Sequence, residues 1–348
     1  MKFVKLTDIC NPKQWKTIST ADFIEDGLYD VYGANGVIGK TNEFNHEVST
    51  LLLTCRGATC GALNITNGRC YVNGNAMCMD DLVEDFNLKF IYYYLKYYDM
   101  SKIISGTAQP QITIASLNKV LIPSISYEEQ LKIVNELEKI ENSITVNRQQ
   151  MSNFDEIVKS QFIEMFDKYN KTELSIIAKI IMGQSPDSKS YNDNCEGVPF
   201  FQGKADYGEK YTIVKHWTTN PTKMAKANSV LMSVRAPVGP VNIANVDCCI
   251  GRGLCSIDSI IGKTNNEFLY NALKVMESDI ALMGSGSTFK AINKNDIFNL
   301  MIPNAPLDLQ NEFSLFAQQI DKSKFIVQKQ IKLLEELLEK KMNEYFGN

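Results

Sequence analysis

Residues 126–168 are the stretch that most restricts how this chain can fold. The whole stretch lacks glycine and proline, and its apolar residues recur at steps of three and four. This spacing is typical of one long amphipathic helix. Ser126 and Glu129 fit a capping box at its start, where their side chains satisfy amide groups that lack helical partners. The apolar stripe consists of Leu131, Val134, Leu137, Ile140, Ile144, Met151, Phe154, Val158, Phe162 and Met165.

A second stretch of the same kind, residues 304–346, lies at the C-terminus. Pro306 suits the first turn of a helix, where an amide hydrogen has no partner in any case. Two long amphipathic helices must bury their apolar stripes, and the simplest arrangement packs one helix against the other. The second stripe consists of Phe313, Phe316, Ile320, Val327, Ile331, Leu334, Leu337 or Leu338, Met342 and Tyr345.

The composition is that of a globular protein with two or three domains in its 348 residues. No apolar run has the length of about 18 residues that a membrane span needs, and the N-terminus lacks a signal-peptide core. Nine cysteines without a regular framework favour a reducing cytoplasm. The net charge of −4 resides mainly on the mid-chain helix. The parts of the chain outside the two helices are near neutral, so the net charge does not exclude basic surface patches there.

Each long helix follows a globular block, and the two blocks repeat one another in sequence. Segment 229–235 matches segment 49–56, and Cys248 matches Cys70. A shift that stays constant within two residues over half a chain indicates an internal duplication. Further pairs at this duplication shift are Asn64 and Asn242, Phe90 and Phe268, Ser105 and Ser285, Ile122 and Ile302, Gln130 and Gln310, Ile140 and Ile320, and Phe166 and Phe346.

The duplication predicts an α+β fold. We expect globular domains over residues 1–125 and 169–304, with helical spacers over residues 126–168 and 305–348. Two equal halves that pack through equal helices imply an antiparallel coiled coil with pseudo-two-fold symmetry. A helix of about 40 residues spans about 60 Å, which exceeds the roughly 34 Å of one DNA turn. Two globular heads on such a spacer suit a bipartite ligand.

Several short motifs follow one another in a characteristic order: residues 121–123 with Glu129 and Gln130, residues 301–303 with Leu309 and Gln310, residues 183–186, Tyr191, residues 197–201, residues 233–235 through 238–239, and the loop 284–288. Through the order of these motifs the chain resembles the specificity subunit of type I restriction-modification enzymes over its whole length. The first block departs from the pattern, because it has residues 11–15 in place of a counterpart of residues 183–186.

This resemblance implies a role in phage defence through DNA methylation. Two target recognition domains would each read one half of a split, asymmetric site in double-stranded DNA. The paired helices would set the spacer between the halves and dock two adenine methyltransferase (modification) subunits. A motor endonuclease (restriction) subunit is an optional further partner. The chain itself would be non-catalytic, without cofactor or metal, cytoplasmic and independent of membranes.

Candidate DNA contacts are polar and aromatic residues on the two blocks. Arg56 and Arg235 occupy the same place in both halves, so a phosphate contact or a structural role fits them better than base reading. The loops 105–111 and 285–290 match in place but differ in content, as expected for heads that read different bases. The candidates are Lys13, Gln14, Trp15, Tyr32, Asn35, Lys40, Arg56, Gln109 and Gln111 in the first head, and Gln184, Lys189, Tyr191, Gln202, Lys204, Tyr207, Arg235, Ser285, Thr288 and Lys290 in the second.

Three other functions compete with this interpretation. A tandem coiled-coil adaptor would bind only proteins and would lack salt-sensitive duplex binding. An enzyme acting alone finds little support, because residues 36–41 resemble a phosphate loop but have Ala34 where the motif needs glycine. A metal site is not expected either, since His46 and His216 form no sequence pair and the cysteines lack CxxC spacing.

Overall fold

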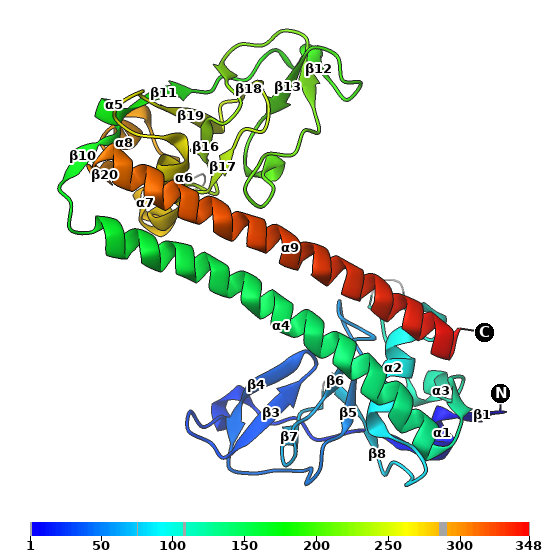
Figure 1. Cartoon of the computed structure of the whole chain (residues 1–348). Helices are drawn as coiled ribbons and strands as arrows, with labels where there is room; N and C mark the ends of the chain where they lie inside the picture. The colour runs from blue at the N-terminus through cyan, green and yellow to red at the C-terminus, as the bar shows by residue number, and fades with distance from the viewer. Residues whose placement is uncertain (1, 75, 107–108, 285–290, 348) are drawn as a thin grey trace. The chain divides into compact units, whose positions relative to one another are not determined.

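A computed structural model describes the whole chain except residues 1, 75, 107–108, 285–290 and 348. The chain divides into two compact units. Unit 1 contains Met1–Arg148 and Lys329–Asn348, and unit 2 contains Gln149–Gln328. Each unit therefore combines one globular block with one half of each long helix (Figure 1).

The block of unit 1 is built on a four-stranded antiparallel sheet in the order β2-β8-β5-β6. One face of the sheet, with Leu51, Leu53 and Met77, packs on α2, because alternate residues of a strand share a face. A three-stranded sheet, β4-β3-β7, covers part of the other face, and β1 pairs with β9. The elements are β1 (Lys2–Lys5), α1 (Leu6–Ile9), β2 (Asn11–Gln14), η1 (Thr20–Asp22), β3 (Tyr29–Gly33), β4 (Gly36–Thr41), β5 (Leu51–Thr54), β6 (Leu63–Ile65), β7 (Tyr71–Val72), β8 (Ala76–Asp80), α2 (Leu88–Tyr97), η2 (Met100–Lys102), α3 (Ile114–Leu117) and β9 (Leu121–Ser124).

The block of unit 2 repeats the central part of this topology and adds strands to the smaller sheet. Its central sheet has the order β11-β19-β16-β17, α6 packs on one face, and β10 pairs with β20. The parallel pair β13–β18 of a five-stranded sheet corresponds to the parallel pair β3–β7. The elements are β10 (Lys171–Glu173), α5 (Leu174–Ile177), β11 (Ala178–Met182), η3 (Ser188–Ser190), β12 (Tyr191–Asn192), β13 (Val198–Phe201), η4 (Lys204–Asp206), β14 (Trp217–Thr218), β15 (Met224–Ala225), β16 (Val230–Ser233), β17 (Val241–Ile243), β18 (Cys248–Ile250), β19 (Leu254–Ser259), α6 (Asn266–Val275), α7 (Glu277–Met283), α8 (Lys294–Phe298) and β20 (Met301–Pro303).

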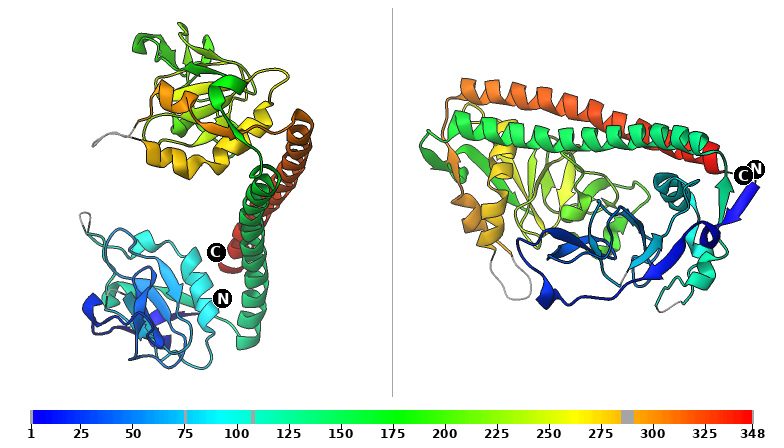
Figure 2. Two further views of the ribbon diagram at one scale, coloured as in Figure 1. Left: turned by 90° about the vertical axis from the view of Figure 1, so that its left-hand side faces the viewer. Right: turned by 90° about the horizontal axis from the view of Figure 1, so that it is seen from below.

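The two predicted long helices are α4 (Tyr127–Phe166) and α9 (Leu307–Phe346), and they pack together (Figures 1 and 2). The capping box is confirmed, since Ser126 N donates to Glu129 Oε2 at 3.1 Å and Glu129 N donates to Ser126 Oγ at 3.3 Å. In unit 1, Arg148 Nη2 of α4 lies 2.7 Å from Glu335 Oε1 of α9. In unit 2, Lys324 Nζ lies 2.5 Å from Asp155 Oδ1. The early part of each helix thus meets the late part of the other, so the pair is antiparallel.

The last aromatic residue of each long helix is buried at an equivalent place. In unit 1, Phe346 packs on Phe90 of α2, with ring centroids 5.7 Å apart. In unit 2, Phe166 packs on Phe268 of α6 at 4.9 Å. Each helix therefore starts on one globular block and ends in the hydrophobic core of the other unit. This arrangement explains why both phenylalanines recur at the duplication shift.

Gln130 and Gln310 are a second pair of residues that recurs at the duplication shift. Both side chains are buried in the first turn of a long helix, and both satisfy backbone carbonyls. Gln130 Nε2 donates to Asp85 O at 2.9 Å, while its Oε1 accepts from Asn87 N at 2.8 Å. Gln310 Nε2 donates to Ala305 O at 2.8 Å. Each glutamine thus fastens its long helix to the preceding block by hydrogen bonds that are costly to leave unmade.

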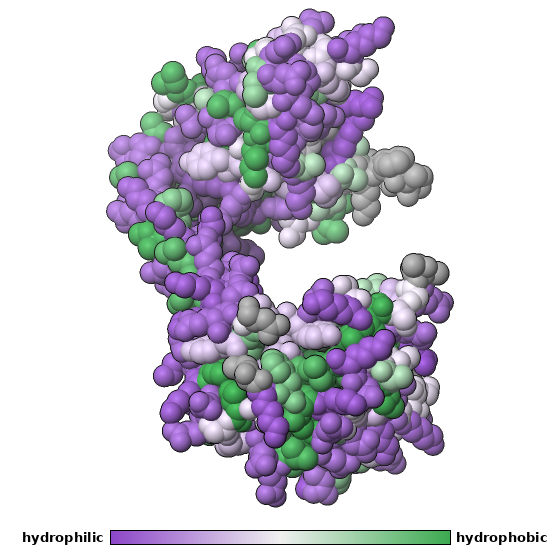
Figure 3. Space-filling model, turned by 90° about the vertical axis from the view of Figure 1, so that its right-hand side faces the viewer, coloured by the Kyte–Doolittle hydropathy of each residue, from purple (hydrophilic) through white to green (hydrophobic). Residues whose placement is uncertain are grey.

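A bilayer-spanning helix is absent from the described part of the chain, because none of its helices is sufficiently long and apolar. On the face displayed in Figure 3, the surface is largely hydrophilic, with separate hydrophobic patches.

Candidate nucleic-acid interface

Arg56 and Arg235 occupy equivalent, exposed positions just after a buried strand. The backbone of Arg56 forms a β-bridge with Gln111, and the backbone of Arg235 forms one with Ala291. Two further backbone bonds repeat this contact, since Ile112 N donates to Cys55 O at 2.9 Å and Ile292 N donates to Val234 O at 3.1 Å. Both halves therefore hold the strand-end arginine against a returning loop with the same backbone geometry.

The loop 105–111 is closed at its base by a pair of backbone bonds between Ser105 and Gln111. Gln111 N donates to Ser105 O at 2.8 Å, and Ser105 N donates to Gln111 O at 2.9 Å. Gln109 and Gln111 are exposed, so their amides are available to a partner. The matching candidates Ser285, Thr288 and Lys290 lie outside the described residues.

A turn before the second strand of the hairpin β3–β4 lies against the same strand end in unit 1. Ala34 O accepts from Thr54 Oγ1 at 2.5 Å and from Asn64 Nδ2 at 3.5 Å, which brings the exposed Asn35 next to β5. Gln14 Nε2 donates to Cys55 Sγ at 3.0 Å. We call the exposed residues around this strand end rim 1: Gln14, Asn35, Arg56, Gln109 and Gln111.

Unit 2 holds an equivalent set of residues around the end of β16. Asn242 Nδ2 donates to Gly208 O at 3.1 Å, as Asn64 does to Ala34 O, and so fastens the segment that follows Tyr207. Gly253 O accepts from Val234 N at 2.9 Å, and a Cβ atom on Gly253 would lie 2.3 Å from Gln202 O. This close approach requires glycine and brings Gln202 next to Arg235. We call the exposed residues of this set rim 2: Gln202, Lys204 and Arg235.

Two tyrosine candidates are less accessible than the sequence suggested. Tyr32 is buried, with 5% of its surface exposed, and its hydroxyl accepts from Asn67 N at 3.1 Å. The Tyr207 hydroxyl is buried without a hydrogen-bond partner among the described residues, and this burial raises the pKa of Tyr207. Both rings fill the small cores beneath the rims rather than facing outward, because an aromatic ring there buries more apolar area.

The remaining candidates lie outside the two sets of residues defined as rims. Lys40 is exposed on β4 opposite Asp30, at the far end of the hairpin from its turn. Tyr191 donates to Pro186 O at 3.1 Å and stacks on Phe200, which is a structural role. Lys189 is exposed on η3, and Gln184 is exposed beside β18, where its backbone N donates to Ile250 O at 2.9 Å.

Lys13 and Trp15 belong to a separate polar cluster of unit 1. Lys13 Nζ lies 3.9 Å from the centroid of the Trp15 ring, as in a cation–π pair. The Trp15 indole donates to Asp80 Oδ2 at 2.8 Å, and its ring meets His46 edge-on at 5.0 Å. The sequence analysis missed this cluster, because the two histidines have no partners at sequence spacing typical of metal or catalytic motifs.

A buried ion pair joins the block of unit 2 to α9. Lys210 Nζ lies 2.6 Å from Glu267 Oε1, also contacts Asp321, and has only 12% of its side chain exposed. Burial by itself would lower the pKa of Lys210, but the nearby carboxylates of Glu267 and Asp321 outweigh it and raise the pKa. The lysine is therefore charged and holds α6, α9 and the segment after Tyr207 together.

Exposed apolar residues recur at equivalent positions on the two long helices. Val146 of α4 and Ile326 of α9 correspond at the duplication shift and are 65% and 57% exposed. Ile157 and Leu337 form a second such pair, with 46% and 41% exposed. The sequence analysis left Leu337 and Leu338 as alternatives for the buried stripe. Leu338 packs on the core of unit 1, and Leu337 is the exposed one.

The sequence comparisons identify one family. A family model described as "Type I restriction modification DNA specificity domain" matches residues 1–153 and 167–336. A putative type I restriction enzyme MjaX specificity subunit of Methanocaldococcus jannaschii is 34% identical over 284 residues, which are 75% of this chain and 67% of that protein. A putative type I specificity subunit, S.MpnORF638P of Mycoplasma pneumoniae, is 24% identical over 270 residues, 73% of this chain and 71% of its own.

Solved structures share the fold. A chain described under "complex assembly and conformational transition of the type I R-M system" aligns over 99% of this chain and 97% of its own, with a TM-score of 0.63 and 23% identity. A type I restriction-modification S subunit from M. genitalium aligns over 98% and 95%, with a TM-score of 0.62 and 17% identity. The predicted α+β architecture, with two β-rich blocks each followed by a long helix, is confirmed.

Proposed function

Since the chain belongs to the family of type I restriction-modification DNA specificity subunits, which are non-catalytic, we propose that its two globular blocks each read one half of a bipartite DNA site. In this proposal residues 1–125 and 169–304 are the two target recognition domains. Residues 126–168 and 305–348 are the helical spacers that set the distance between the half-sites.

The observation that carries the proposal is that rim 1 and rim 2 share a backbone scaffold but differ in side chains. Arg56 and Arg235 are common to both, which suits phosphate oxygens present at every site. Gln111 and its counterpart Ala291 differ, as do Ala34 and its counterpart Gly208. A glutamine amide matches the edge of adenine, and alanine does not. A shared backbone that presents different side chains favours recognition of two different half-sites.

The other candidates of the sequence analysis remain predictions, and the structure supports them to different degrees. Lys40, Lys189 and Lys204 are exposed cations, suited to phosphate contacts. In this proposal buried Tyr32 supports the geometry of rim 1, Tyr191 packs on Phe200 of β13, and neither contacts DNA. Three further candidates, Ser285, Thr288 and Lys290, fall outside the described residues, so only their sequence supports them.

The long helices would dock two copies of a modification subunit. The duplicated pairs, Val146 with Ile326 and Ile157 with Leu337, support this, because exposed apolar positions that recur at a constant shift fit two copies of one partner. A restriction subunit would join the complex through those partners. The chain is part of a type I restriction-modification complex. We propose that its partners in that complex are two modification subunits and a restriction subunit.

Methylation mapping tests the proposed function. We would coexpress the chain with its cognate modification subunit and sequence the DNA for modified adenine. A bipartite, asymmetric motif that appears only with the chain is the expected result. Variants with Arg56→Ala or Arg235→Ala should weaken methylation, while Arg69→Ala, an exposed arginine of unit 1 away from rim 1, should leave it unchanged. Methylation independent of the chain would instead favour the protein-only adaptor.

A further inference from the structure

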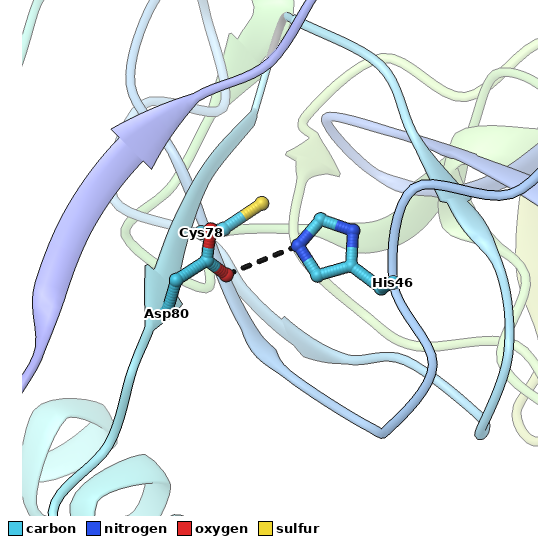
Figure 4. Close-up of side chains that lie close together, drawn as sticks. All are labelled: His46, Cys78 and Asp80. Atoms are coloured by element: carbon cyan, nitrogen blue, oxygen red, sulfur yellow. Dashed lines mark hydrogen bonds and ion pairs between the residues drawn. The ribbon is translucent and has the colours of Figure 1, made fainter.

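Three side chains with metal-ligand chemistry converge in unit 1, outside both rims. His46, Cys78 and Asp80 each offer one ligand atom, and these atoms lie within 4.8 Å of one another (Figure 4). Cys78 and Asp80 are alternate residues of β8, so both side chains leave the same face of the strand. His46 comes from the segment before β5, where its backbone bridges Cys70.

The orientation of the His46 ring is set by its neighbour. Asn45 Oδ1 accepts from Val72 N at 2.7 Å and Asn45 Nδ2 donates to Val72 O at 2.9 Å, so the amide can adopt only one orientation. His46 Nδ1 lies 2.7 Å from Asn45 Oδ1 and must therefore donate. A ligating histidine typically donates its other ring N–H to an oxygen in this way. The Nε2 atom then faces Asp80.

His46 Nε2 lies 3.0 Å from Asp80 Oδ1, an atom that only accepts hydrogen bonds when the carboxylate is ionised. The Asp80 carboxyl also accepts from the Trp15 indole at 2.8 Å and from Thr50 Oγ1 at 3.4 Å, which hold it in place. With Nδ1 as the donor to Asn45, the Nε2 atom of a neutral imidazole directs its lone pair at Asp80 Oδ1. A nitrogen lone pair and a carboxyl oxygen that face each other in this way form part of a cation site.

We propose that His46 Nε2, Cys78 Sγ and Asp80 Oδ1 bind a divalent transition-metal ion, with Zn²⁺ as the best match. Mixed nitrogen, thiolate and carboxylate ligands suit Zn²⁺ at about 2.0–2.3 Å. Tetrahedral ligands at that distance are about 3.5 Å apart, so the observed spacing needs only small side-chain movements. On binding, the Cys78 S–H bond breaks and its proton leaves to solvent, while His46 Nε2 donates its lone pair to the ion. One thiolate and one carboxylate then balance the two positive charges of Zn²⁺.

The second half of the chain supplies an internal comparison. Asp258 is the counterpart of Asp80, and its carboxylate accepts hydrogen bonds from the hydroxyls of Ser229 and Ser256. Ser256 is the counterpart of Cys78 at the same shift that relates Cys248 to Cys70. The aspartate is thus shared by both halves. The histidine and the thiol occur only in unit 1, which favours a ligand-binding role specific to that half.

The surroundings of the cluster suit a bound ion. A cavity of about 520 Å³ is lined by His46, Asp80, Lys13 and Trp15, among others, so two of the three ligands border space for a water as fourth ligand, while Cys78 is buried behind them. Trp15 and Thr50 hold the Asp80 carboxylate, as outer-shell partners of a metal site do. An ion there would also hold the neighbouring Lys13–Trp15 pair in place. The proposed metal site does not depend on the proposed function.

Metal binding is measured on the purified full chain after chelator treatment. We would titrate Co²⁺ and follow the thiolate-to-cobalt charge-transfer absorption, then displace Co²⁺ with Zn²⁺ and count bound zinc by mass spectrometry. The expected result is one ion per chain and a thiolate band. Cys78→Ser should abolish the band, and His46→Gln should abolish stoichiometric binding. Asn45→Ala, which leaves all three ligands in place, should weaken binding about 10- to 100-fold.

Matched controls separate binding from loss of folding. His216→Gln removes the other histidine, which is half-buried in unit 2 and lies 2.6 Å from Asp193, and should leave binding unchanged. Circular dichroism of every variant reports folding, and Cys78→Ser follows the residue that unit 2 carries at this place. No bound ion in the folded wild type, or an ion retained in both ligand variants, would overturn the proposal and leave a His46–Asp80 ion pair only. DNA methylation is not the readout, so failure here leaves the proposed function standing.

Discussion

Lengthening both long helices by one heptad tests whether they set the spacer. We would duplicate residues 147–153 in α4 and residues 327–333 in α9, which are equivalent at the duplication shift. Arg148 and Glu335 are in contact, so both insertions fall at the same level of the antiparallel pair. Seven residues add about 10 Å at 1.5 Å per residue and turn the helix face by only about 20°.

The proposal requires the two recognition domains to move apart by that amount. At about 3.4 Å per base pair, the spacer should lengthen by about three base pairs while both half-sites stay unchanged. Three base pairs also rotate one half-site by about 100° about the DNA axis, so the extent of methylation should fall. Methylation mapping of the coexpressed variant gives the new motif directly.

A variant with the insertion in α4 alone is the matched control. It shifts one stripe against the other without lengthening the pair as a whole, so it should lose methylation rather than change the spacer. An unchanged spacer in the variant with both insertions, at normal expression and folding, would refute the idea that the helices act as a ruler.

Three further predictions follow from contacts within the two units. Arg56→Ala and Arg235→Ala should each lower the slope of log Kd against log salt by about one, measured by fluorescence anisotropy on target duplex. Lys210→Met should destabilise unit 2 by about 3–5 kcal/mol in urea unfolding, because a buried carboxylate loses its cation. Since the pKa of Lys210 is raised, this contribution persists below 10.5, its ordinary value, and disappears as pH rises through the folded pKa. Val146→Asp and Ile326→Asp should each remove one docked modification subunit, and the double variant both, by sedimentation velocity.

The sequence by itself determined the architecture, because the long helices and the duplication are periodic patterns that survive without tertiary information. A stripe at steps of three and four specifies a helix and the face that it buries, and the capping residues Ser126 and Glu129 act within one turn. The constant shift also identified Gln130 and Gln310 as equivalent positions before any contact was known. The bonds of Gln130 with Asp85 and Asn87, and of Gln310 with Thr264, join distant segments, so the tertiary structure supplied them.

Only the tertiary structure decided which side chains meet. His46 and Asp80, like Arg56 and Gln111, lie far apart along the chain, yet strand pairing brings each pair together. Tyr32 looked like a surface reader, but its ring is buried because the small sheet closes over it. Exposure of Leu337 rather than Leu338 depends on how the partner helix packs. Such contacts arise from register and packing between distant segments, and no short-range sequence pattern encodes them.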